Sequence, residues 1–202
     1  MATSKERSGE ERERDEGPVQ RAVRTAIDST EILSVGVLHL VRTTLVTVLS
    51  DTRDVGSEIG EAAVTAVRGS IKAAGEIGGD LGMIAKQAIK GTIQAADEIG
   101  SQLGGVARSA TQSAVRTTSD VGGDVAGVAR KAIEGTIEAA RELGADVIQL
   151  AQSAAEGAIE AADHIGASAS RAVRRHLGSR VNGVNLVGSP RPPRARRSSR
   201  KG

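Results

Sequence analysis

A repeat with a fixed period of 22 residues is the feature that most constrains what this chain can fold into. Five ten-residue segments match one another: GSIKAAGEIG, GTIQAADEIG, SAVRTTSDVG, GTIEAARELG and GAIEAADHIG, which begin at Gly69, Gly91, Ser113, Gly135 and Gly157. The register extends backward to Leu49, Val55 and Ile59, which fall one period before Ile71, Ile77 and Leu81. Six or more units are present, so the fold must use one structural element many times.

The spacing of apolar residues within one unit predicts that this element is an amphipathic α-helix. Twenty-two residues are two blocks of eleven, and eleven residues make three helical turns at about 3.67 residues per turn. Ile71, Ile77 and Leu81 then share one side of the helix, while Lys72 and Glu76 lie on the other. Strand periodicity is absent, and no proline occurs between residues 18 and 190. We therefore predict an all-α fold.

Two arrangements of the helical repeat are open. A continuous helix over residues 33–177 would be on the order of 220 Å long. Breaks at Gly78 and Gly79, at Gly104 and Gly105, or at Gly122 and Gly123 would instead fold it into hairpins or a bundle. In either case the apolar side should face a surface or a partner, and it consists of Leu49, Val55, Ile59, Ile71, Ile77, Leu81, Ile84, Ile89, Ile93, Ile99, Leu103, Val106, Val115, Val121, Val125, Val128, Ile133, Ile137, Leu143, Val147, Leu150, Ile159 and Ile165.

The many glycines mean that the helix should be stable only when its apolar side is covered. Eighteen glycines lie between Gly56 and Gly166, and each costs a helix interior about 1 kcal/mol relative to alanine. A lone helix in water should then be largely unfolded, unless a lipid or polymer surface, another copy or its own other half buries the apolar side. Small residues also recur along one edge, where helices could pack closely; the predicted close-packing positions are Gly78, Gly82, Gly100, Gly104, Gly122, Gly144 and Gly166.

Residues able to support catalysis or to bind a metal are few. The chain lacks Phe, Tyr, Trp and Cys, which excludes disulfides and thiolate metal sites. His39, His164 and His176 are scattered without ligand partners at useful spacing. The glycine-rich stretch 75–82 lacks the GK[ST] ending of a phosphate loop. We therefore expect a protein that is not an enzyme, with no cofactor, no metal and no small-molecule substrate.

Charge divides the chain into three regions. Residues 1–20 should be a disordered charged N-terminus, and residues 21–178 the repetitive helical region, with its clearest repeats over 47–178. Residues 179–202 read as a disordered basic Arg/Pro tail. From residue 171 onward the chain has ten basic and no acidic residues. Such a segment can bind nucleic acid without sequence readout, or anionic lipid; the candidate residues are Arg174, Arg175, Arg180, Arg191, Arg194, Arg196, Arg197, Arg200 and Lys201.

The most hydrophobic stretch, residues 32–50, raises the question of a membrane. Its charge-free run over residues 32–41 is too short to span a bilayer, and insertion of the whole stretch would require Arg42 to be tolerated. The charged N-terminus has no apolar run typical of a secretory signal. We expect a cytoplasmic protein, with peripheral association to a membrane or granule open.

The period and the apolar side resemble known families. Over residues 33–177 the chain resembles the 11-residue-repeat amphipathic helices of perilipins and exchangeable apolipoproteins, and more loosely the phasins that coat storage granules. That resemblance implies a peripheral coat on a lipid, membrane or polymer surface. The chain is also similar to late-embryogenesis-abundant proteins, which implies a stress protectant that folds conditionally. A self-assembling helical or coiled-coil scaffold is the remaining alternative.

Overall fold

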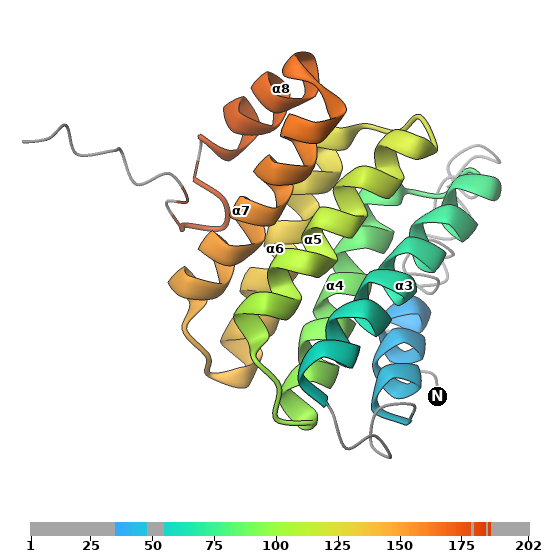
Figure 1. The fold of residues 1–202 in the computed structure, drawn as a ribbon, viewed down its shortest axis with the longest axis vertical. Coiled ribbons are helices and arrows are strands. Elements are labelled where there is room, and N and C mark those ends of the chain that lie inside the picture. The colour runs from blue at the N-terminus through green and yellow to red at the C-terminus, as the bar shows by residue number, and fades with distance from the viewer. Residues whose placement is uncertain (1–34, 48–54, 179, 185, 187–202) are drawn as a thin grey trace, which may run out of the picture.

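The computed structural model describes residues 35–47, 55–178, 180–184 and 186. They form a helix over residues 35–47, followed by α3 (Val55–Glu76), α4 (Leu81–Glu98), α5 (Leu103–Asp120), α6 (Val125–Leu143), α7 (Val147–Ile165) and α8 (Ala167–Leu177). This part of the chain contains no β-strand, so the predicted all-α class is confirmed. Of the two arrangements left open, the structure has the folded bundle and not the straight helix (Figure 1).

The helices lie in two layers, and sequence neighbours alternate between them. In Figure 1, α3, α5 and α7 lie side by side in the front layer, with α4 and α6 behind them. The most extensive contacts join helices that are two apart in the sequence, α5 with α7 and α4 with α6. The helix over residues 35–47 extends the second layer beside α4, and α8 packs on α6 and α7 at the other end.

A turn of three or four residues explains why the period is 22. Gly78, Gly100, Gly122 and Gly144 follow successive helices with φ of 69°, 71°, 74° and 68°, a left-handed conformation that glycine adopts without strain. The amide of the next residue then closes the turn on the helix, as Gly79 N–H does on the Ala74 carbonyl at 2.8 Å. Helices α4 and α5 have 18 residues and four-residue turns, and α6 has 19 residues and a three-residue turn, so each unit totals 22 residues.

An aspartate is the N-cap residue of three of the helices that follow these turns. The carboxylate of Asp80 accepts a hydrogen bond from Met83 N–H, and those of Asp124 and Asp146 each accept two amides of the next first turn. Such caps satisfy amides that have no partner within the helix. At the equivalent Gln102 no side chain caps the helix. Two of the predicted breaks occur, at residues 78–79 and 122–123, whereas Gly104 and Gly105 lie inside α5.

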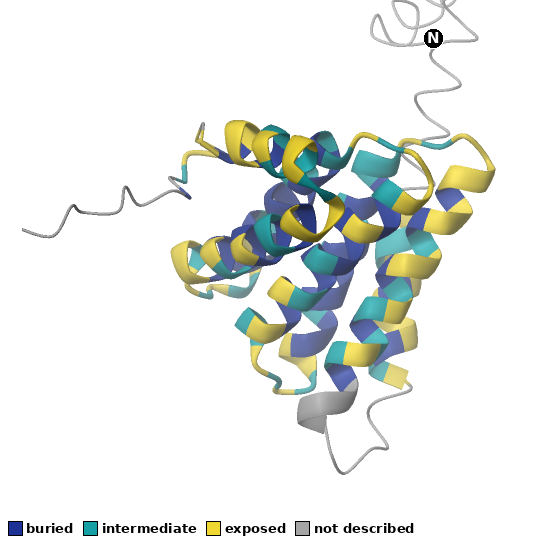
Figure 2. Cartoon of the chain, turned by 45° about the horizontal axis from the view of Figure 1, so that its top comes forward, coloured by how far each residue is buried: buried dark blue, intermediate teal, exposed yellow. Residues whose placement is uncertain are grey.

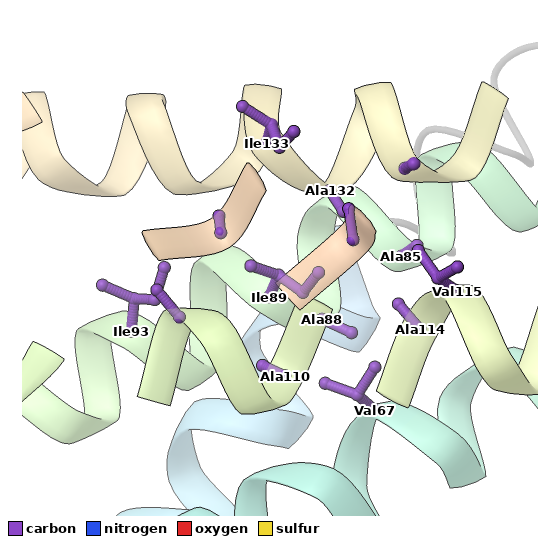
Figure 3. Packing of buried hydrophobic residues seen from close by; sticks show 14 of the residues in the cluster. Val67, Ala85, Ala88, Ile89, Ile93, Ala110, Ala114, Val115, Ala132 and Ile133 are labelled. Carbon is purple, nitrogen blue, oxygen red and sulfur yellow. The ribbon is translucent and has the colours of Figure 1, made fainter. Parts of the chain in front are cut away.

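The core lies between the two layers and within them. Fully buried Ile71, Ile93, Val115 and Ile137 come from α3, α4, α5 and α6 at the same position of the repeat. Alanines fill the spaces around them, as Figure 3 shows for Ala85, Ala88, Ala110, Ala114 and Ala132. Figure 2 shows buried residues on the inward side of each helix and exposed ones outside. The chain's own helices therefore cover the apolar side.

The glycines destabilise the folded bundle less than they would destabilise one straight helix, because many of them are not inside helices. Seven of the eighteen lie outside the helices, in the turns: Gly78, Gly79, Gly100, Gly122, Gly123, Gly144 and Gly166. Five of the seven predicted close-packing positions are therefore turn residues, beside which a Cβ would meet open space. The other two, Gly82 and Gly104, lie in the first turns of α4 and α5, where a Cβ would lie 3.2 Å from Lys131 Cγ and 3.3 Å from Ser153 Oγ.

Candidate functional site

One small residue per repeat sets how closely helices pack within a layer. A Cβ at Gly135 in α6 would overlap the Lys86 carbonyl of α4, and one at Gly157 in α7 would overlap the Arg108 carbonyl of α5. At the equivalent Ser113 of α5, the hydroxyl donates to the Val64 carbonyl of α3 at 3.1 Å. A Cβ at Gly91 in α4 would likewise lie too close to the Leu38 carbonyl, so each helix from α4 to α7 presents this position to the backbone of the helix two before it. Sequence reasoning identified these positions as repeat starts but missed the contact.

Ion pairs on the outer surface repeat in the same register. Lys86 of α4 pairs with Glu138 of α6 at 2.7 Å, and Arg108 of α5 pairs with Glu160 of α7 at 2.8 Å. Each pair spans 52 residues, one in each layer. The hydrogen bond from Arg108 lowers the pKa of Glu160 below its ordinary value. The Arg108–Glu160 pair is exposed, so it should contribute little to stability.

A groove opens at the N-terminal end of the bundle. The helix over residues 35–47 and α3 form its walls, and the start of α4 closes one end; it encloses about 440 Å³. Its surface is mostly apolar, with Leu40, Ala73 and Ile77 among the lining side chains. Ile77 is 70% exposed and Leu40 is 68% exposed. We name this site, between residues 35–47 and α3, the α3 groove.

Three of the four polar side chains that line the α3 groove are already hydrogen-bonded to their own helices. Thr65 Oγ1 donates to the Glu61 carbonyl and Ser70 Oγ to the Ala66 carbonyl, both at 2.9 Å. Asp80 at the closed end accepts the Met83 amide at 3.0 Å. With these groups occupied, the groove offers an apolar surface and few directional contacts. That surface suits an apolar helix face better than a polar small molecule.

The opposite end of the bundle is basic. Val173 and Leu177 of α8 are buried against the bundle, one helical turn apart, while Arg171, Arg174 and Arg175 are exposed. Arg174 pairs with Asp163 of α7 at 2.9 Å. The Ser170 hydroxyl bonds Asp163 and, with Arg174, lowers the pKa of that carboxyl below its ordinary value. Within the described part of the chain, Arg171 and Arg175 have no carboxylate within ion-pair distance. We name α8 and Arg180 the basic end.

A tight turn after α8 completes this end. Val181 and Val184 exchange two backbone hydrogen bonds, at 3.1 and 2.9 Å, and Arg141 of α6 donates to the Asn182 carbonyl at 2.8 Å. Val181 and Leu186 are buried. Packed structure therefore continues past residue 179, where the sequence placed the start of a disordered tail. Arg191, Arg194, Arg196, Arg197, Arg200 and Lys201 lie outside the described residues.

Metal and membrane sites are not found in the described part of the chain. It contains no group of three His, Asp or Glu side chains that could hold a metal ion. His164 Nδ1 lies 2.7 Å from the Glu160 carbonyl, and His176 Nδ1 lies 3.0 Å from that of Ala172, each on its own helix. None of the described helices is long and apolar enough to cross a membrane. Residues 32–34 and 48–50 of the hydrophobic stretch lie outside the described residues.

The residues predicted to face a surface or partner fall into three groups. Buried in the chain's own core are Ile59, Ile71, Ile84, Ile89, Ile93, Val106, Val115, Val128, Ile133, Ile137 and Leu150. Half-buried at its edges are Leu81, Ile99, Leu103, Val125, Leu143, Val147 and Ile159. Exposed near helix ends are Ile77, Val121 and Ile165. Leu49 lies outside the described residues, and the side chain of Val55 is not described.

Comparison with protein families and with curated proteins gives no match. No protein-family model matches the chain, and no curated protein matches it. The two candidate sites, the α3 groove and the basic end, therefore rest on the geometry of this chain alone.

Proposed function

We propose that this chain is a non-enzymatic helical-repeat scaffold that holds a basic C-terminal segment for binding a phosphate-bearing polyanion, of which nucleic acid is the first candidate. The observation that carries the proposal is the division of α8 into two faces. Val173 and Leu177 hold it on the bundle, while Arg171 and Arg175 point outward without carboxylate partners among the described residues.

Electrostatics support this assignment. The basic end has no acidic residue of its own, and the sequence continues into the Arg/Pro segment that ends at Lys201. Arginine contacts to phosphate are independent of base sequence and weaken steeply with salt. The chain has no aromatic residue for stacking on bases, so the expected binding is to the backbone. The apolar side of α8 is already used against α6 and α7, which favours a polyanion held electrostatically over insertion into lipid.

Coating of a lipid or granule surface, which the resemblance implies, remains a second proposal. It requires side chains such as Ile93 and Ile137, now fully buried, to leave the core and face the surface. The repeats would have to separate, so coating would change the tertiary structure. The exposed apolar residues at helix ends offer a smaller starting surface, among them Val121 and Ile165.

Binding by the full chain to a labelled DNA duplex, across a series of salt concentrations, tests the proposal. Arg171→Gln with Arg175→Gln should reduce the slope of log affinity against log salt by about 2, since each phosphate contact contributes roughly 0.9. The matched control is Arg68→Gln with Arg116→Gln, the same charge change on exposed positions of α3 and α5, which should leave the slope unchanged.

Two results would contradict the polyanion proposal. One is absence of DNA binding at low salt; the other is an equal effect of the test and control pairs. Vesicles of neutral lipid with and without phosphatidylserine form the second arm. Stronger binding to anionic vesicles than to DNA would assign the basic end to lipid headgroups. Binding to neutral vesicles with separation of the helices would favour the coat.

A further inference from the structure

Asp163, in the last turn of α7, is the acidic residue that lies beside the basic end. No aspartate or glutamate follows it in the sequence, and residues 164–202 hold ten arginine and lysine residues. Only Gly166 separates α7 from α8. Arg141 of α6 and Ser119 of α5 take the same position of the repeat as Asp163, so the repeat itself does not require a carboxylate there. The contacts of Asp163 are therefore particular to this end of the array.

A network of three side chains joins α7 to α8 at this point. Arg174 Nη2 donates to Asp163 Oδ2 at 2.9 Å, and Arg174 Nε donates to Ser170 Oγ at 3.2 Å. The Ser170 hydroxyl in turn donates to Asp163 Oδ1. The hydrogen bond from Ser170 and the charge of Arg174 lower the pKa of Asp163 below its ordinary value, so the carboxylate is ionised at neutral pH. The network thus holds one edge of the Arg174 guanidinium against a full negative charge.

Arg174 lies between the two arginines on which the proposed function depends. Arg171 is three positions before it on α8, and Arg175 follows it directly. Residues three or four apart on a helix have Cβ atoms about 5–6 Å apart, so Arg171 has both other arginines as neighbours. Within the described part of the chain, only Arg174 of the three has a carboxylate within ion-pair distance. Two arginines of α8 are therefore available to phosphate, and a third is engaged.

A phosphate group at Arg174 would have to compete with Asp163. The Arg174 side chain is 54% exposed and the Asp163 side chain is 46% exposed, so a phosphate that reaches the guanidinium also meets the carboxylate. The two like charges repel each other. While the ion pair is intact, the charge of Arg174 is already compensated, and it adds little to the counterion release that drives polyanion binding. Asp163 therefore weakens the binding of a polyanion to this surface.

We propose that Asp163 limits the basic end to two phosphate-binding arginines of α8 by holding Arg174 in this network. The inference rests on the proposed function and adds the residue that sets how tightly the basic end binds a polyanion. Val173 and Leu177 are 0% and 1% exposed and hold α8 on the bundle, whereas a half-exposed ion pair contributes little to stability. Removing the charge of Asp163 should therefore release Arg174 as a third phosphate contact and leave α8 in place.

Binding of the full chain to a labelled DNA duplex, across a series of salt concentrations, tests this role. Asp163→Asn keeps the size of the side chain and removes its charge. It should steepen the slope of log affinity against log salt by about 0.9, so that the affinity falls roughly 3.5-fold further between 50 and 200 mM salt than that of the unmodified chain. The matched control is Asp97→Asn, the same charge change at the same repeat position of α4, which is exposed and on a helix that does not contact α8. Its slope should equal that of the unmodified chain.

The double variant Asp163→Asn with Arg174→Gln identifies the released contact. It should lose the added slope, because Arg174 is the side chain that the first substitution sets free. A double variant that keeps the added slope would overturn the proposal.

Three further results would also overturn it. Weaker DNA binding by Asp163→Asn would mean that the network positions α8 for binding. Equal tightening by Asp163→Asn and Asp97→Asn would be an effect of net charge alone. An unmodified chain that does not bind DNA at low salt would overturn the proposed function itself, and this inference with it, whereas the first two results leave the proposed function standing.

Discussion

The two ends of the helical array are closed in different ways. At the C-terminal end α8 packs on α6 and α7, buries Val173 and Leu177, and turns an arginine-rich face outward. At the N-terminal end of the described array, α3 and the helix over residues 35–47 leave an apolar groove with Ile77 exposed. Repeat arrays need terminal units with a polar outer face. The C-terminal end has such a unit among the described residues, whereas the described residues at the N-terminal end leave the α3 groove uncovered.

The largest expected effect comes from the cap at the C-terminal end. Leu177 is 1% exposed, so Leu177→Ala should lower the free energy of unfolding by about 2–5 kcal/mol through lost burial and a cavity. Ile148→Ala in α7 is the matched control, because Ile148 is 59% exposed, and should lower it by less than about 0.5 kcal/mol. Urea unfolding monitored by circular dichroism measures both. Equal losses would mean that α8 does not cap the array.

The equivalent glycines of α7 and α3 give the sharpest comparison of the two ends. Gly157→Ala should lower the free energy of unfolding by about 1–3 kcal/mol, because the Arg108 backbone must move away. Gly69→Ala should instead raise the free energy of unfolding by about 1 kcal/mol, the ordinary helix preference for alanine, because a Cβ there would meet nothing within 4 Å among the described residues. A loss at Gly69 as large as that at Gly157 would contradict the open side of α3.

A smaller effect should distinguish capped from uncapped turns. Asp146→Ala removes the acceptor of the Ile148 and Gln149 amides and should lower the free energy of unfolding by about 1 kcal/mol. Gln102 occupies the same position without a capping bond, so Gln102→Asp should raise it by about 0.5–1 kcal/mol. Thermal unfolding of both variants checks the pair. We expect the two substitutions to change the free energy of unfolding in opposite directions. A lower free energy of unfolding for Gln102→Asp would contradict this description of the turns.

The smallest effect is an acid-dependent one at the basic end. Hydrogen bonds from Ser170 and Arg174 lower the pKa of Asp163 in the folded chain. The contribution of this carboxylate to the free energy of unfolding is therefore complete above the ordinary aspartate pKa of about 3.9, and it is lost as the pH falls through the lower pKa of the folded chain. Asp163→Asn should therefore be less stable than the unmodified chain at pH 6, and the difference should shrink below about pH 4. A difference that grows at acid pH would contradict the sign of this shift.

The helical class and the buried residues of each repeat could be predicted from sequence, but the path of the chain could not. Ile71, Ile93 and Ile137 recur with a period of 22 residues. This period fits a straight helix of 11-residue blocks, and it fits equally well a shorter helix that ends in a tight connection to the next one. The pairs Gly78 with Asp80 and Gly144 with Asp146 carry the missing signal, because a left-handed glycine shortly before an N-cap aspartate ends one helix and begins another.

The candidate sites depend on tertiary contacts that no periodicity contains. Gly135 and Gly69 occupy the same position of the repeat, yet only the pairing of helices two apart in sequence makes one a backbone contact and leaves the other beside a groove. The arginines of α8 could be identified from charge alone. The role of Val173 and Leu177 in holding that helix on the bundle required the structure.

A distance between α3 and α7 tests the central claim, that the repeats fold back on one another within one chain. Spin labels can be attached at Arg68→Cys and Glu156→Cys, two exposed positions 88 residues apart at the same point of the repeat. Three side-by-side helices place the α3 and α7 axes about 16–20 Å apart, so the labels in dilute, lipid-free buffer should lie roughly 20–40 Å apart. A distance on the order of 130 Å, that of a continuous helix, or a broad distribution that narrows only on a surface, would contradict the folded array.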